Sequence, residues 1–486
     1  MPEFDKDLRS IQEARDLASK AFAAWKVWSK ASQEQVDKVC AAMAEAAYNN
    51  AGALGIQAHE ETGYGVSEHK RLKNEFASKN VWESIKDIKT VGVIAQYPEK
   101  KIYEIAWPIG VITGLTPSTN PTSTVMYKIL VSVKARNAIV IAPHPSAAKC
   151  SYETAQIMAV AAEKNGAPPG LISCMQNISL DGTNALMRHK YTALILATGG
   201  TPMVRAAHST GKPAIGVGPG NVPVYVDRSA DLEIAARYIT ASKAFDHSTI
   251  CATEQSVVAD KPIANQLASL MQKEGAYFTG PEETKLLRKL LFYPDGTMNT
   301  AVVGKSAQYV AGMAGFTIPV KSRILVTPLK ITGKEEPLSR EKLTTVLGWY
   351  EEQGWEAGCE RCIELIQFGG RGHSLMIHAT DQKVIMAFGL EKPVFRIGVN
   401  TMGTLGAIGL TTGVMPSMTL GSGGVGGSIS GDNITTTHLM DIKRLAYEIT
   451  APPPGAMVPG SQKPGPSARE IEKVVQNVVD EILNIR

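Results

Sequence analysis

Cys251 is the residue of this chain whose surroundings first suggest chemistry. It lies in the polar stretch AFDHSTICATEQSVVAD at 244–260, and a segment that alternates like a β-strand follows it directly. A thiolate attacks a carbonyl carbon well, whereas a hydroxyl needs a nearby base. The other interpretation is a small apolar filler of the core. The local pattern leaves both interpretations open.

The other cysteines offer no comparable pattern. Six cysteines in a chain of 486 residues are not a disulfide framework, and they indicate a cytosolic, thiol-reducing setting. Cys359 and Cys362 form a C-x-x-C in a helix-like segment, without a second pair of metal ligands. We interpret this pair as ordinary helix packing and expect no metal site.

Composition excludes several classes of partner. Hydrophobic residues make up 44% of the chain and charged residues 20%, as in a globular protein, and the net charge is only +4. That charge gives no argument for nucleic acid or an anionic membrane as a partner. The N-terminal stretch lacks the layout of a secretory signal, and no apolar run is long enough to cross a bilayer. We expect a cytoplasmic protein without nucleic-acid or membrane partners.

The elements that must position Cys251 are strands and helices in alternation. Residues 5–50 are predicted to be helical, and four apolar runs follow at 109–117, 137–145, 192–200 and 222–227. Continuous apolar strands separated by helices predict an α/β fold with a parallel sheet covered on both faces. Ligands of such sheets bind at the carboxyl ends of the strands.

The length of the chain predicts two or three domains. We expect a ligand-binding domain at 1–226, from which the segment 90–108 projects as a polar hairpin. A catalytic domain at 227–430 carries Cys251, and a return segment occupies 431–450.

The tail has a different character. Residues 451–466 are rich in Pro and Gly and are predicted to be an extended linker. Ser467 and Glu470 then form a capping box, and apolar residues fall on one stripe of a helix over 467–486. This amphipathic helix packs either on its own domain or a sister subunit, or into a groove on another protein.

Several longer stretches together resemble the aldehyde dehydrogenase superfamily, and specifically its coenzyme A-acylating branch. They run from about 90 to 447 and read PIGVITGLTPSTNPTSTVMYK, KARNAIVIAPHPSAAK, ATGGTPMVRAAHSTGKPAIGVGPGN, STICATEQSVV, LSREKLTTVL, GRGHSLMIH, TLGSGGVGGSIS and HLMDIKRLA. The resemblance implies a Rossmann-type NAD-binding domain, an α/β catalytic domain and a small oligomerisation hairpin, in a homodimer or tetramer.

The resemblance also implies catalytic roles. Cys251 matches the nucleophile, and Asn120 matches the asparagine whose amide holds the oxyanion together with the Cys251 N–H. Such a donor typically lowers a barrier by about 2.7–4 kcal/mol. The alternative for Asn120 is a turn cap ahead of Pro121. His373 matches a family histidine and would assist transfer to coenzyme A; the alternative is a hydrogen-bonded structural histidine.

The cofactor is expected at the carboxyl edge of the first sheet. Thr198, Gly199, Gly200 and Thr201 match the loop that meets the phosphates of NAD, where a helix offers free N–H groups. Glu341 matches the glutamate that accepts hydrogen bonds from the nicotinamide ribose; the alternative is a solvated charge at a helix start. NADP is the alternative nucleotide. The remaining residues expected to contact cofactor or coenzyme A are Thr116, Pro117, His144, Pro145, Gly218 and Gly220.

One missing carboxylate predicts the acyl acceptor. Water-using aldehyde dehydrogenases carry a glutamate, the base for hydrolysis, in the segment that reads PAIGVGPGN here. No carboxylate stands in this segment. A thiol is partly ionised near neutral pH and needs less help than water. The resemblance therefore implies that the acyl group leaves on coenzyme A.

The aldehyde itself is less constrained by the sequence. We expect a short-chain aldehyde, with sulfoacetaldehyde or succinic semialdehyde as alternatives. Arg396 would face such an anion or form a structural ion pair. The tail resembles the encapsulation peptides of bacterial microcompartment enzymes, so a shell protein is an expected partner of 467–486. The rival functions are a water-using dehydrogenase and a non-catalytic scaffold.

Overall fold

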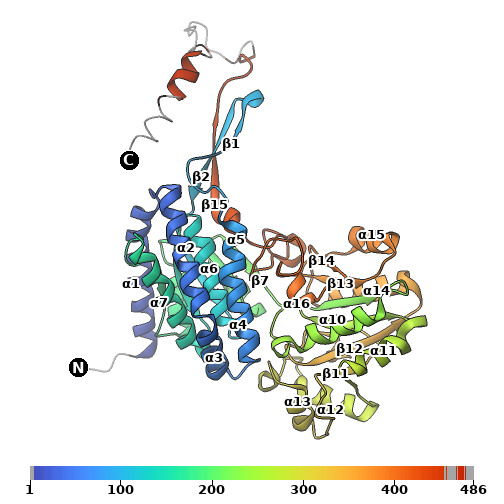
Figure 1. Ribbon diagram of the computed structural model, residues 1–486. Helices are drawn as coiled ribbons and strands as arrows, with labels where there is room; N and C mark the ends of the chain where they lie inside the picture. Colours follow the sequence, from blue (N-terminus) through green and yellow to red (C-terminus); the bar gives the residue numbers. More distant parts are fainter. Residues whose placement is uncertain (1–4, 454–455, 457–466, 468, 476, 478–486) are drawn as a thin grey trace. The chain divides into compact units, whose positions relative to one another are not determined.

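The computed structural model describes residues 5–453, 456, 467, 469–475 and 477 (Figure 1). The chain divides into a first unit, Met1–Ile94 with Ile105–Lys443, and a second unit, Ala95–Glu104 with Arg444–Arg486. All strands that the first unit arranges in its two large sheets are parallel. This arrangement confirms the α/β class.

The first unit begins with helices rather than with one continuous helix over 5–50. Ser32 interrupts the run, because its side chain accepts a hydrogen bond from Gln35 N and starts a new helix. A left-handed Gly63 later ends another helix. The helices are α1 (Lys6–Trp28), α2 (Gln33–Asn49), α3 (Ala51–Thr62), α4 (Ser67–Glu75), the π-helical turn η1 (Phe76–Asn80) and α5 (Val81–Ile85).

A five-stranded parallel sheet follows, in the order β5-β4-β3-β6-β7. Its strands are β3 (Val111–Thr116), β4 (Ala138–Pro143), β5 (Ile172–Cys174), β6 (Thr192–Thr198) and β7 (Ala214–Val217). The strand order reverses between β3 and β6, which makes the carboxyl ends of these two strands the place where a Rossmann-type sheet binds its ligand.

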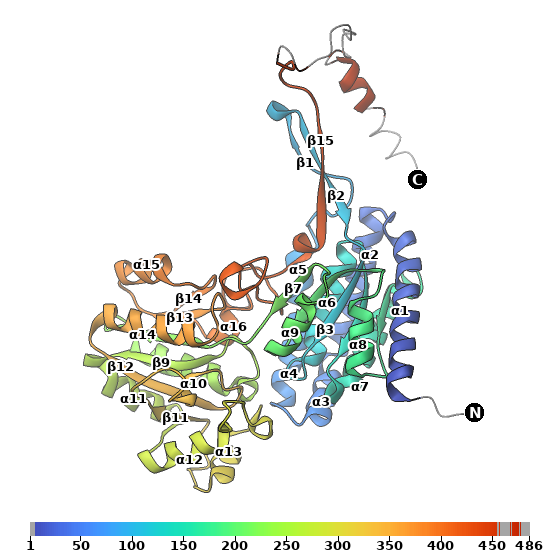
Figure 2. The same cartoon turned by 180° about the vertical axis from the view of Figure 1, so that it is seen from behind.

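Helices cover both faces of this sheet (Figures 1 and 2). On one face lie α6 (Pro121–Lys134) and α7 (Ala148–Lys164), with α2 packed on them. On the other face lie α1, α8 (Leu180–Met187) and α9 (Thr201–His208). Every residue of β3, β4 and α6 is buried, as their continuous apolar character predicts.

The rest of the first unit contains a seven-stranded parallel sheet in the order β10-β11-β12-β9-β8-β13-β14. Its strands are β8 (Val222–Val226), β9 (Glu254–Asp260), β10 (Ala276–Phe278), β11 (Ile324–Pro328), β12 (Val346–Glu352), β13 (Leu375–His378) and β14 (Ile397–Val399). The accompanying helices are α10 (Leu232–Ala244), α11 (Ala264–Lys273), α12 (Pro281–Leu291), α13 (Ala307–Ala314), α14 (Gly354–Phe368), α15 (Gln382–Glu391) and α16 (Gly403–Gly406).

A three-stranded sheet forms in the order β1-β2-β15, from β1 (Val93–Tyr97), β2 (Ile102–Pro108) and β15 (Met440–Ala446). Within the second unit, Arg444 pairs with Glu104 at 2.9 Å, and Tyr447 N donates to Lys101 O. Residues 469–475 are helical, and Ser467 and Glu470 make the expected capping box. Residue 477 is also helical, whereas 468, 476 and 478–486 of the predicted helix and 454–455 and 457–466 of the predicted linker lie outside the described residues.

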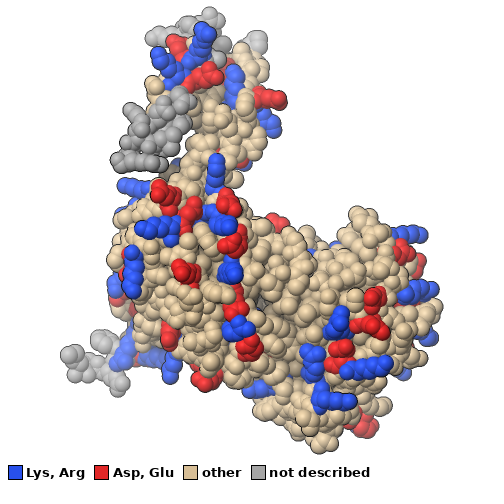
Figure 3. All heavy atoms as spheres, viewed as in Figure 1, with Lys and Arg blue, Asp and Glu red and all other residues tan. Residues whose placement is uncertain are grey.

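Acidic and basic side chains are interspersed on the face of the first unit drawn in Figure 3. This mixture agrees with the small net charge of +4. None of the described helices combines the length and the apolar character that a bilayer span requires.

Candidate active site

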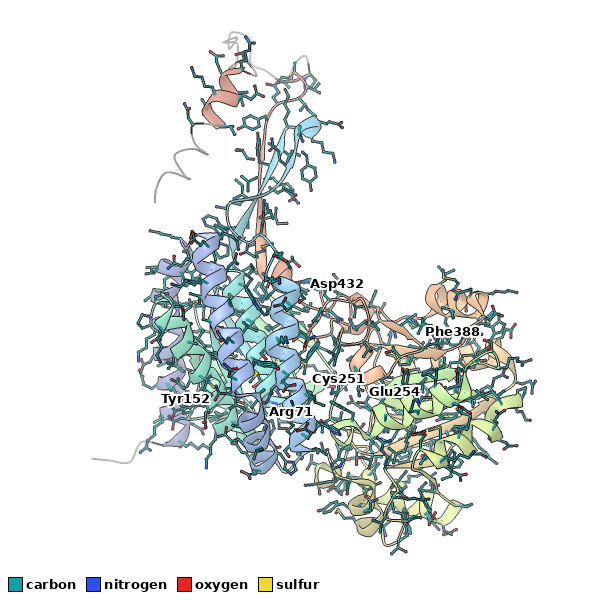
Figure 4. All side chains as sticks on the ribbon, in the orientation of Figure 1. Arg71, Tyr152, Cys251, Glu254, Phe388 and Asp432 are labelled. Atoms are coloured by element: carbon teal, nitrogen blue, oxygen red, sulfur yellow. The ribbon has the colours of Figure 1, made fainter. Side chains whose placement is uncertain are left out.

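The predicted catalytic residues gather because two sheet edges meet in the first unit. Asn120 follows β3, at the carboxyl edge of the five-stranded sheet. Gly220, Cys251 and His373 each precede a strand, and those strands (β8, β9 and β13) are neighbours. Since parallel strands place their amino ends together, these three residues share the amino edge of the seven-stranded sheet. Cys251 lies where the two parts of the first unit meet (Figure 4).

The Cys251 thiol faces an imidazole. Its Sγ lies 3.3 Å from His373 Nε2, and the side chain is partly buried. Burial raises the pKa of Cys251 to about 12; the Glu341 carboxylate adds to this rise, and the Arg396 guanidinium opposes it. The resting group is therefore a thiol at neutral pH, and its activation requires a proton acceptor.

His373 is the imidazole that lies beside this thiol, and it is neutral. Burial, and then the Arg396 charge, lowers its pKa to about 3. Its Nδ1 lies 3.0 Å from Ser374 Oγ, which lets Nδ1–H donate while Nε2 stays free to accept the thiol proton. Gly220 makes room for this pair: a Cβ there would lie 2.4 Å from Cys251 O and 3.0 Å from the His373 ring.

Asn120 is not the cap that the alternative interpretation required, because its side chain makes no capping hydrogen bond to α6. Its Nδ2 donates to Thr249 O at 3.0 Å and to Thr119 Oγ1 at 3.2 Å. Its Oδ1 accepts from Lys73 Nζ at 2.5 Å. The weaker bond to Thr119 is the one that an oxyanion would replace.

Sequence reasoning missed the charges behind Asn120. Lys70 and Lys73 on α4 both pair with Asp246, and all three are almost fully buried. Only a weak sequence signal exists for them, because charges spaced three apart on a helix are normally solvated. The three-residue spacing from Lys70 to Lys73, which puts two lysines on one helix face, was the only available sign.

Glu341 is half-buried, and the alternative interpretation of a solvated charge at a helix start is wrong. It follows the short 3₁₀ turn η7 (Pro337–Ser339) and lies in a loop, where Oε1 accepts from Gly220 N at 2.9 Å. Burial raises its pKa to about 7. Arg396 also differs from expectation: its guanidinium donates to the carbonyl oxygens of Gly421 and Gly431 rather than forming a structural ion pair.

The carboxyl edge of the five-stranded sheet fits a dinucleotide. Thr116 ends β3 with a buried hydroxyl that has no hydrogen-bond partner. Thr198 ends β6, and Gly200 caps the start of α9 with a free helix N-terminus. These two loops flank the point where the strand order reverses.

The other residues expected to contact the cofactor lie in neighbouring loops. Pro117 follows Thr116. His144 and Pro145 lie after β4, where Ser146 N donates to His144 Nδ1. Gly218 has open space around it.

The C-x-x-C pair lies away from these residues. Cys359 and Cys362 are buried in α14, and Lys392 donates to Cys359 Sγ. Across the residues that the structure describes, no group of three or more His, Cys, Asp or Glu side chains could hold a metal ion.

Comparison with curated proteins gives a family. A model of the aldehyde dehydrogenase family matches residues 5–280. Aldehyde-alcohol dehydrogenase 2 of Entamoeba histolytica is 40% identical over 446 residues, which are 90% of this chain and 51% of that protein. The chain spans about half the length of this relative and of the bacterial aldehyde-alcohol dehydrogenases that it matches.

Solved structures share the fold over most of the chain. An acetylating aldehyde dehydrogenase from Geobacillus thermoglucosidasius has 48% identity and a TM-score of 0.91, covering 93% of this chain and 100% of its own. A propionaldehyde dehydrogenase from a Clostridium phytofermentans fucose utilisation microcompartment has 29% identity and a TM-score of 0.80, covering 91% and 98%. A Rhodopseudomonas palustris propionaldehyde dehydrogenase, solved with bound CoA and an acylated cysteine, has 25% identity and a TM-score of 0.81, covering 89% and 97%.

These findings agree with the motifs and with the order of the strands. The family model spans more than half of the 486 residues. The chain belongs to the aldehyde dehydrogenase family.

Proposed function

We propose that this chain is a coenzyme A-acylating aldehyde dehydrogenase, which converts an aldehyde, coenzyme A and NAD⁺ to an acyl-CoA and NADH through a thioester on Cys251. The observation that carries the proposal is the Cys251 Sγ–His373 Nε2 distance of 3.3 Å, with the Asn120 amide held at the same junction. The R. palustris relative with CoA and an acylated cysteine supports it.

Each residue of the site has its own role in forming the thioester. Cys251 Sγ attacks the carbonyl carbon while its proton passes to His373 Nε2. The resulting oxyanion accepts hydrogen bonds from Asn120 Nδ2 and the Cys251 N–H. The loops at Thr116 and Thr198 would hold NAD, which would accept the hydride from this carbon. Cys251 is left as a thioester, and the thiolate of coenzyme A displaces it.

Coenzyme A rather than water is the proposed acceptor because no carboxylate is placed to activate water. Among the described residues, the hydrogen-bond partners given for Cys251 Sγ and His373 include no carboxylate oxygen. The Glu341 carboxylate is engaged by Gly220 N. The segment 213–221, which includes Gly218 and Gly220, contains no carboxylate.

A short, uncharged aldehyde is the proposed substrate. A cavity of about 150 Å³ lies against Lys73, the residue that bonds to Asn120, and its wall is mainly apolar: Leu72, Phe76, Phe245, Leu405 and Ile408. The Lys73 ammonium already donates to Asp246, Asn120 and Thr249, which leaves it no free hydrogen bond for a sulfonate or carboxylate. Arg396 lines a second cavity of about 560 Å³, and its buried Nε has no hydrogen-bond partner among the described residues. Anionic aldehydes are therefore included among the substrates to be tested.

The proposal is tested by mass and by turnover. Enzyme mixed with propionaldehyde and NAD⁺, without coenzyme A, is expected to gain one acyl group on Cys251, and Cys251→Ala is expected to gain none. NADH formation should then depend on added coenzyme A; steady turnover to free acid without it would support the water-using alternative. A panel that includes sulfoacetaldehyde and succinic semialdehyde, with both nucleotides, defines the substrate.

We also propose that the tail targets the enzyme to a microcompartment, where residues 467–486 bind a shell protein. The support is the amphipathic pattern of this segment and the microcompartment origin of the C. phytofermentans neighbour. Deleting 451–486 is expected to preserve turnover and abolish co-assembly with shell protein. Loss of a homodimer or tetramer in the same variant would instead assign the tail to subunit packing.

A further inference from the structure

The orientation of the Asn120 amide is set by two partners with opposite requirements. A lysine ammonium can only donate a hydrogen bond, and Lys73 Nζ faces Oδ1 at 2.5 Å. A backbone carbonyl can only accept, and Thr249 O faces Nδ2 at 3.0 Å. Rotating the amide by 180° would place N–H groups against the ammonium and an oxygen against the carbonyl. The donor nitrogen is therefore held toward Thr249, two residues before Cys251.

Lys73 itself is fixed by a buried carboxylate. Its side chain is 2% exposed and donates to Asp246 Oδ2, which also binds Lys70 at 3.3 Å. Thr249 Oγ1 donates to the same Asp246 oxygen at 2.5 Å. One carboxylate thus holds both the residue that orients Asn120 Oδ1 and the residue whose carbonyl receives Asn120 Nδ2.

The backbone around Asp246 is strained, and hydrogen bonds made by Asp246 hold it in this conformation. Asp246, His247 and Ser248 have φ values of 47°, 49° and 68°, in the left-handed region that non-glycine residues rarely adopt. Val66 N donates to Asp246 Oδ1 at 2.7 Å, and Asp246 N donates to His69 Nδ1 at 2.8 Å. The strain lies directly before Thr249 and Cys251, where the position of the backbone decides the geometry of the reaction.

We propose that Lys73 is a positioning residue of the oxyanion hole: its ammonium orients and polarises the Asn120 amide, while Asp246 ties this amide to the Cys251 loop. The inference rests on the proposed thioester function and assigns a role to a residue outside the reacting pair. Lys70, Lys73 and Asp246 sum to one positive charge, and this charge stands behind the amide where negative charge develops on the substrate.

The test compares two buried lysines that share one carboxylate. Lys73→Met is expected to slow the burst of NADH by about 10- to 100-fold, part of the loss expected for a whole oxyanion donor. Alkylation of Cys251 by iodoacetamide should keep its rate, because this displacement develops no oxyanion. Lys70→Met is the matched control: it also leaves Asp246 short of a partner but does not touch Asn120, and its burst should change less than about threefold.

A double-mutant cycle separates positioning from packing. Asn120→Ala is expected to slow the burst by about 100- to 1,000-fold, and adding Lys73→Met should cost little more, because the amide on which Lys73 acts is gone. If the burst of the double variant were slowed by the full product of the two single-variant factors, the proposal would be wrong. If Cys251→Ala still formed NADH, the thioester function itself would be wrong, whatever Lys73 does.

A second variant and the native enzyme cover the case in which Lys73→Met fails to fold. Lys73→Gln keeps a donor without a charge and should recover part of the burst. In the native enzyme, burial lowers the pKa of Lys73 to about 8, with Asp246 opposing this shift and Lys70 adding to it; these are the charged groups that face it. The NADH burst rate should therefore fall as the pH rises through about 8, while the alkylation rate continues to rise. A burst rate that does not fall between pH 7 and 9 contradicts the proposal.

Discussion

Two buried clusters of titratable groups adjoin the residues Thr249–Cys251, and they carry their protons in opposite ways. Cys251 and His373 are kept neutral, with pKa values of about 12 and about 3. Lys73 and Asp246 form a buried ion pair, in which burial raises the pKa of Asp246 but Lys73 and Lys70 outweigh it and hold it well below its usual range.

The difference teaches that burial alone does not decide charge. In the first cluster the Arg396 charge only partly offsets the desolvation of the Cys251 thiolate and adds to that of the His373 imidazolium, so the neutral forms win. In the second cluster the opposite charges lie in contact, so the ionised forms persist. A neutral thiol with a neutral imidazole moves a proton only when substrate is attacked, whereas the charge of the second cluster is present before the anion forms.

The largest expected effect tests the neutral cluster. His373→Ala should slow acylation of Cys251 by about 100- to 10,000-fold, because, among the residues that the structure describes, His373 Nε2 is the side-chain atom that hydrogen-bonds to the Cys251 thiol. The measurement is the NADH burst in rapid mixing. His378→Gln is the control, since it alters another buried neutral imidazole at the far end of β13. Equal losses in both variants would reduce His373 to a packing role.

The next effect tests the charged cluster through stability. Asp246→Asn leaves Lys70 and Lys73 buried without a carboxylate and should lower the free energy of unfolding by about 3–5 kcal/mol. Glu68→Gln on the same helix removes an exposed partner of Arg71 and should change it by less than about 1 kcal/mol. Urea unfolding followed by circular dichroism measures both. A small effect of Asp246→Asn would mean that this cluster carries no charge.

A smaller effect concerns the space within the cluster of Cys251 and His373. Gly220→Ala would bring a Cβ against Cys251 O and the His373 ring, which we expect to cost about 1–3 kcal/mol of stability and to slow alkylation of Cys251. Gly389→Ala, in the exposed helix α15 with nothing within 4 Å, should be neutral or stabilising. Thermal unfolding and alkylation rates together show whether the close approach at Gly220 matters.

The last effect is gradual and follows the pH. Because the pKa of Cys251 is raised to about 12, its alkylation rate should rise by about tenfold per pH unit from 7 to 10 without a plateau. A plateau near pH 9 would show that the thiol has an ordinary pKa, and the contrast between the two clusters would weaken.

Much of the fold follows from sequence patterns. The apolar runs at 109–117, 137–145, 192–200 and 222–227 contain β3, β4, β6 and β8, because fully buried parallel strands need continuous apolar residues. The family and the α/β class are confirmed. The domain boundaries stay predictions, and so does the oligomeric role of the hairpin.

The site was harder to predict from the sequence. Cys251, Asn120, His373 and Gly220 are brought together as expected, but the rule for parallel sheets pointed only to carboxyl edges. Cys251 and His373 lie at an amino edge, which no local pattern reveals. Lys73 and Asp246 are 173 residues apart, and their pairing depends on how the two sheets pack. Long-range pairing of this kind leaves no periodic signal in a single sequence.

The junction of two sheet edges has a consequence for recombination. The first half of the reactive geometry, Lys70, Lys73 and Asn120, is encoded before residue 121, and its counterpart, Asp246 with Thr249, after 245. A chimaera with a relative that is joined anywhere between these positions would inherit the two sets from different parents. Engineered exchanges of the coenzyme-binding half should therefore carry both sets from one parent, however compatible the remaining surfaces are.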